Sequence, residues 1–123
     1  MTRQELQGLI GRHIITPYPG FMVIGIILPT YSDAKIFSRE IAAMFAELPS
    51  WLDPKVRTIT TREIEYDFGK FVFMYGPNCG RGRSFDSIYM SSRLSDKDKD
   101  QHCFAILPML SSGKTFITFD DSH

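Results

Sequence analysis

The chain has 123 residues, of which 43% are hydrophobic and 23% are charged. This composition is typical of a globular domain and excludes a disordered, collagen-like or low-complexity chain. Lys and Arg together number 14, as do Asp and Glu, so the net charge is zero. A protein that holds nucleic acid by bulk electrostatic attraction carries a clear basic excess, which this sequence lacks. The charge balance therefore does not identify a partner.

No segment of the sequence predicts membrane insertion or secretion. The longest apolar run, Phe21 to Pro29, is far shorter than the roughly 20 residues of a membrane-spanning helix. The segment Met1 to Gly11 is polar and mixed in charge, unlike a signal peptide. Cys79 and Cys103 lack C-x-x-C spacing, which favours two thiols in a reducing cytosol, with one disulfide left open. We therefore expect a cytoplasmic protein.

The first half of the sequence predicts helix, loop, strand and helix. Thr2 to Ile15 has apolar residues at helical spacing, and Thr2 with Glu5 forms a capping-box pattern. Two prolines and a glycine between residues 16 and 20 predict a loop. Phe21 to Leu28 is apolar throughout and rich in β-branched residues, which is typical of a strand covered on both faces. A helix is expected next, with Ser32 as its N-cap and Pro49 ending it.

That second helix carries the clearest amphipathic pattern of the chain. Its predicted core stripe consists of Phe37, Ile41, Met44, Phe45 and Leu48. Charged residues lie away from this stripe, so one face is expected to pack against a sheet.

The second half predicts further strands around one hairpin. Val56 to Thr60 is rich in β-branched residues, and Glu63 to Tyr75 reads as a hairpin whose turn is Gly69-Lys70. The remaining predicted elements are a strand at Phe85 to Met90, a charged surface stretch at Ser92 to Asp100, a helix at Gln101 to Leu110 and a strand at Thr115 to Phe119. Alternating strands and helices predict a single α/β domain over residues 1–123, with a mostly parallel sheet, flanking helices and one antiparallel hairpin.

Two segments in this order resemble a known family. The run Gly25 to Phe37 reads Gly-Ile-Ile-Leu-Pro-Thr-Tyr-Ser-Asp-Ala-Lys-Ile-Phe, and the run Arg81 to Met90 reads Arg-Gly-Arg-Ser-Phe-Asp-Ser-Ile-Tyr-Met. With a helix and a hairpin between them, they resemble the ATPase domain of phage terminase large subunits, the P-loop motors that package viral DNA. The resemblance covers about Thr2 to Phe119. It implies a truncated P-loop NTPase-like (RecA-like) core and, for a viral protein, location in the host cytoplasm.

The same resemblance implies that the catalytic groups of the family are missing. In the family, a glycine-rich phosphate loop leads directly into a helix. The corresponding position in this sequence is Met1-Thr2, which does not provide such a loop. The magnesium-binding Asp and the catalytic Glu of the family fall on Ser91 and Ser92, which cannot replace carboxylates. We therefore expect no catalytic residue, no cofactor and no metal in this chain.

The leading hypothesis is a non-catalytic, terminase-like phage protein that binds another protein as a structural piece or regulator of DNA packaging. The first alternative is one part of a split terminase- or helicase-type ATPase, completed in trans. The second is a nucleic-acid-binding module, so DNA stays open as a partner; no membrane partner is expected.

Three basic residues are the candidates for binding a partner or a phosphate. Arg81 and Arg83 stand on a glycine-rich loop, where guanidinium groups bind phosphate or carboxylate, or pair with Asp86 or Glu65 to close the loop. Lys114 lies in Ser112-Gly113-Lys114-Thr115, which fails the P-loop test because residue 108 is proline and a strand follows.

Two other motifs fail their spacing tests. Asp96 to Asp100 begins like a calcium loop but has Gln101 at the glycine position. His102 and Cys103 lack zinc-ligand spacing.

The last predicted strand is the candidate interface. Because the family places its phosphate-loop strand beside this one, the resemblance implies that it lies at the edge of the sheet here. Its residues are Thr115, Phe116, Ile117, Thr118 and Phe119. An apolar edge strand pairs readily with another chain, so we expect it to dock a second copy or a polypeptide that supplies a strand.

Overall fold

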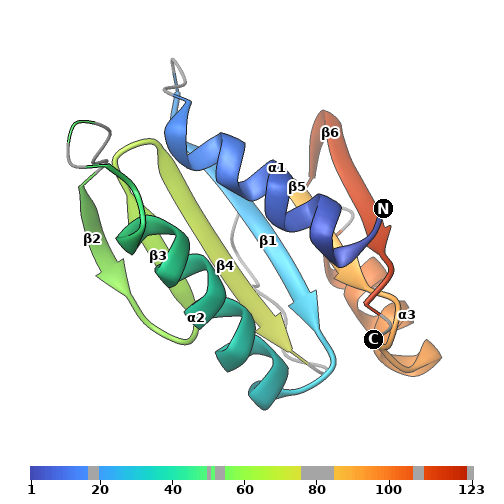
Figure 1. Ribbon diagram of the computed structural model, residues 1–123. Helices are drawn as coiled ribbons and strands as arrows, with labels where there is room; N and C mark the ends of the chain where they lie inside the picture. Colours follow the sequence, from blue (N-terminus) through green and yellow to red (C-terminus); the bar gives the residue numbers. More distant parts are fainter. Residues whose placement is uncertain (17–19, 50, 52–54, 76–84, 107–109, 122–123) are drawn as a thin grey trace.

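The computed structural model describes residues 1–16, 20–49, 51, 55–75, 85–106 and 110–121, with only the backbone for 102–106 and 110–115 (Figure 1). The elements in chain order are α1 (Arg3–Ile15), β1 (Met22–Leu28), α2 (Tyr31–Ala46), β2 (Val56–Ile59), β3 (Glu63–Tyr66), β4 (Gly69–Tyr75), β5 (Phe85–Ser91), α3 (Asp96–Ile106) and β6 (Leu110–Phe119). The strands form a six-stranded sheet in the order β2-β3-β4-β1-β5-β6. The α/β prediction, with a mostly parallel sheet, flanking helices and an antiparallel hairpin, is confirmed.

β1 is the central strand on which the parallel part of the sheet is built. It pairs in parallel with β4 and with β5, and β5 pairs in parallel with β6. The last five residues of β1 are all buried, because both faces of the sheet are covered at this point. The continuous apolar run in the sequence therefore predicted this strand correctly.

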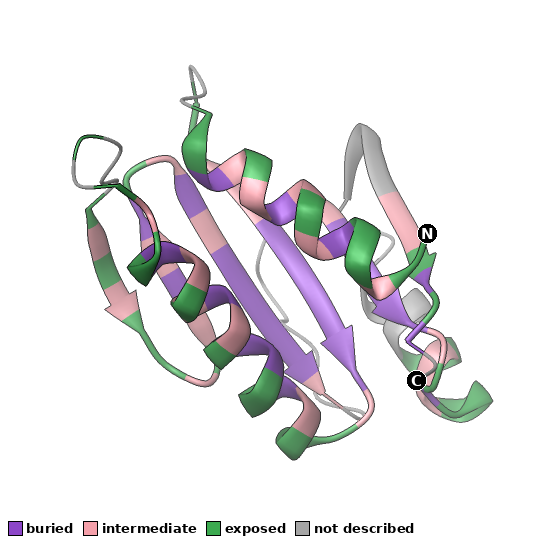
Figure 2. Cartoon of the chain, in the orientation of Figure 1, coloured by how far each residue is buried: buried purple, intermediate pink, exposed green. Residues whose placement is uncertain are grey.

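Two packed layers of side chains cover the sheet. On one face, α1 and α2 lie side by side over the strands and bury Leu6, Ile10, Phe37 and Ile41 against them (Figures 1 and 2). On the other face, a smaller cluster consists of Ile27, Val72, Met74, Phe85, Ile88, Met90 and Leu94. The predicted stripe of α2 faces the first layer, with Met44 and Leu48 partly buried at its margin.

The helix starts follow from local hydrogen bonds. Thr2 caps α1 as predicted, its Oγ1 accepting from the backbone N–H of Glu5 at 3.1 Å. The prediction that Ser32 caps α2 is wrong, because Thr30 takes this role. The Thr30 hydroxyl accepts from the N–H of Asp33 at 3.2 Å and donates to the Asp33 carboxylate at 2.7 Å. This reciprocal pair starts the helix two residues earlier than predicted.

The hairpin is confirmed, but its turn is not Gly69-Lys70. Asp67 and Phe68 form the turn, and Gly69 is already the first residue of β4, paired with Tyr66 and Met22. A Cβ at residue 69 would overlap the carbonyl oxygen of Met22. The glycine is therefore needed for the close approach of β1 to β4 and not for the turn itself.

The third helix and the last strand both begin earlier than predicted. α3 starts at Asp96, where Ser95 Oγ accepts from the N–H of Asp98 at 3.2 Å. Asp96 and Asp98 in the first turn also favour a helix start, because carboxylates stabilise the positive end of the helix dipole. The segment read as a charged surface stretch is thus partly helical, and β6 begins at Leu110 instead of Thr115. No helix among the described residues is long and apolar enough to cross a membrane.

Gly69→Ala should lower the free energy of unfolding by about 3 kcal/mol, because the new methyl group collides with rigid backbone. Gly8→Ala is the matched control, since nothing lies within 4 Å of a Cβ at that helical position. The control should leave stability equal or raise it by up to about 1 kcal/mol. Urea unfolding measures both; equal stability of the two variants would contradict the close approach of β1 and β4.

Candidate functional site

The carboxyl ends of four parallel strands, β4, β1, β5 and β6, meet at one edge of the sheet. β1 leads into α2 on one face, whereas β5 leads into α3, which Figure 1 shows behind the sheet. Right-handed crossovers predict the same arrangement. The chain passes from β1 to β4 in one direction along the sheet and from β5 to β6 in the other, so α2 and α3 are expected on opposite faces. The connections after β1 and after β5 thus leave toward opposite faces of the sheet. Open α/β sheets bind ligands at the point between two such neighbouring strands. This carboxyl edge is the candidate site.

A buried carboxylate, Asp121, lies at the carboxyl edge two residues after the end of β6. Its side chain is 0% exposed. Oδ1 accepts from Nη1 of Arg3 at 2.7 Å, and Oδ2 accepts from Nε and Nη2 of Arg93 at 3.1 and 2.9 Å. The Ser91 hydroxyl donates to Oδ2 at 3.1 Å. Both oxygens are therefore engaged by groups of this chain.

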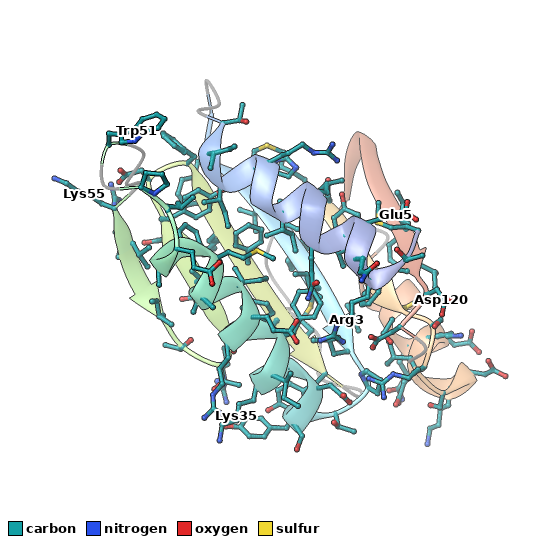
Figure 3. All side chains as sticks on the ribbon, in the orientation of Figure 1. Arg3, Glu5, Lys35, Trp51, Lys55 and Asp120 are labelled. Atoms are coloured by element: carbon teal, nitrogen blue, oxygen red, sulfur yellow. The ribbon has the colours of Figure 1, made fainter. Side chains whose placement is uncertain are left out.

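The two arginines extend this network to α2. Nη2 of Arg93 also donates to Oδ1 of Asp33 at 2.8 Å. Arg3 donates to Glu40 at 3.2 Å and lies over the Phe37 ring, 4.9 Å from its centroid. Figure 3 shows Arg3 pointing from the start of α1 toward the space between α1 and α2. The ion network therefore joins α1, α2 and the ends of β5 and β6.

The network shifts the protonation equilibria of its members. Burial alone would raise the pKa of Asp121, but hydrogen bonds from Arg3 and Arg93 lower it below its ordinary value. Burial likewise opposes the lowered pKa of Asp33, which the hydroxyl of Thr30 and the guanidinium of Arg93 produce. The pKa values of Arg3 and Arg93 are raised by the same contacts, so Asp33, Asp121 and both guanidiniums are charged throughout the physiological range.

The chemistry available at the carboxyl edge is limited by these contacts. The two serines after β5 provide hydroxyl groups; Ser91 donates to Asp121, and Ser92 Oγ accepts from the backbone N–H of Asp121 at 3.2 Å. Among the residues that the structure describes, no group of three His, Cys, Asp or Glu side chains could hold a metal ion. Two guanidinium groups beside Asp121 also oppose the approach of a divalent cation.

The basic residues predicted from the sequence have no described side chains. Arg81 and Arg83 lie outside the described residues, as does Cys79. Lys114 lies in β6, where only the backbone is described. Of the two acidic residues expected to pair with the arginines, Asp86 accepts from the N–H of Val23 at 2.8 Å. The described residues therefore leave the three predicted basic residues untested as a binding site.

The edge position of β6 agrees with the sequence-based expectation. β6 is the last strand of the sheet, and Thr115 to Phe119 pair with Ser87 to Ser91 of β5 on one side. Whether another chain pairs with the opposite side stays a prediction.

Sequence reasoning missed Arg3, Arg93 and Asp121. Asp121 belongs to no motif of the sequence, although a charged residue soon after an apolar strand is a usable signal for the carboxyl edge. The partners could not be found by spacing, because Arg3 and Asp121 are 118 positions apart in the sequence.

No protein-family model matches this chain, and no curated protein sequence matches it. The resemblance to terminases therefore depends on the motifs alone.

Asp121→Asn should lower stability at neutral pH by about 3 kcal/mol, because it leaves two guanidinium groups without their buried counter-charge. The folded pKa of Asp121 is depressed. Its contribution is therefore complete above the ordinary pKa of about 3.9 and is lost as the pH falls through the folded value. The curves of wild type and variant should converge below pH 4, as urea unfolding at a series of pH values would measure.

Asp100→Asn is the matched control, since Asp100 is an exposed carboxylate on α3. It should change stability by less than about 0.5 kcal/mol at any pH. A constant difference between wild type and Asp121→Asn down to pH 2 would contradict the depressed pKa.

Proposed function

We propose that this chain is a non-catalytic, terminase-like domain that acts by binding another protein, as a structural piece or regulator of viral DNA packaging. On this proposal the domain has a truncated P-loop NTPase-like (RecA-like) core, and it works in the cytoplasm of the host. The proposal combines the motif resemblance with the chemistry of the carboxyl edge.

The observation that carries the non-catalytic part is the state of Asp121. A nucleotide-hydrolysing site of this class needs a carboxylate that faces magnesium and another that activates water. The resemblance puts those functions on Ser91 and Ser92. The buried carboxylate beside them, Asp121, has both oxygens engaged by Arg3, Arg93 and Ser91. Freeing it for a metal ion would take from Arg3 and Arg93 their buried counter-charge, which costs several kcal/mol.

The protein-binding part is supported by the opposite feature, the unpaired side of β6. β6 pairs with β5 along one side, and no strand of the described residues pairs with its other side. A strand of this kind is a common docking element.

A second candidate is an ATPase completed in trans. The start of α1 favours it, because Met1 and Arg3 exchange backbone hydrogen bonds with Asp120 at 2.7 and 3.0 Å. This places a helix N-terminus at the carboxyl end of β6, a position suited to an anion. Such an enzyme would still need carboxylates from another chain.

Titration of the purified protein with Mg-ATP separates the two candidates. The proposal expects no saturable heat and no hydrolysis by the isolated chain. It expects the same result for Asp121→Asn, since removing that charge creates no metal ligand. Saturable Mg-ATP binding by the wild type would contradict the non-catalytic reading.

The trans-completed candidate requires a different result. Hydrolysis would have to appear when packaging proteins are added to the chain, and it would have to depend on the chain. Stable association with those proteins without added hydrolysis would favour the regulator or structural piece.

A further inference from the structure

We draw no further inference here: the strongest candidate, the surface patch of exposed apolar side chains at the amino end of β1 (Ile15 at the end of α1, Phe21 before β1 and Trp51 after α2), carries none, because nothing in the described part of the chain shows what covers it.

Discussion

The buried carboxylate of Asp121 is the constraint on which the carboxyl edge of this fold depends. A charge taken out of water is tolerated only if hydrogen bonds and counter-charges replace the lost solvation, and Arg3, Arg93 and Ser91 supply them. These partners come from the start of α1 and the end of β5. One side chain thereby links the start of the first helix, the end of β5 and the segment after β6.

This constraint also determines what the edge can do. In an open α/β sheet the carboxyl ends of the strands offer the natural place for a ligand, because loops diverge there and helix N-termini face it. Here that place is filled by ion pairs among Asp33, Arg93, Asp121 and Arg3. The arrangement stabilises the fold at the position where an enzyme would keep groups available for substrate. By contrast, no strand of the described residues pairs with the outer side of β6 before Asp120, which is why we propose protein binding at this edge.

Much of the fold could be predicted from the sequence because local patterns specify it. The apolar run of β1, the stripe of α2 and the alternation Ile64 and Tyr66 against Glu63 and Glu65 each report burial directly. Errors occurred at element boundaries, where single hydrogen bonds decide. Thr30, and not Ser32, caps α2. Gly69 is required by the close approach of β1 and not by the turn. The candidate site was not predictable in the same way, because its ion pairs join residues from opposite ends of the chain that only the sheet order brings together.

The central claim, that the carboxyl edge is closed by its own charges, is tested most directly at Asp121 itself. An NMR titration that follows the side-chain carboxyl carbon of Asp121, with and without Mg-ATP, reports both its pKa and its contacts. The account predicts a pKa below the ordinary range of an aspartate and no change in the Asp121 or Arg93 signals when Mg-ATP is added. An ordinary or raised pKa, or a saturable movement of those signals with Mg-ATP, would contradict it.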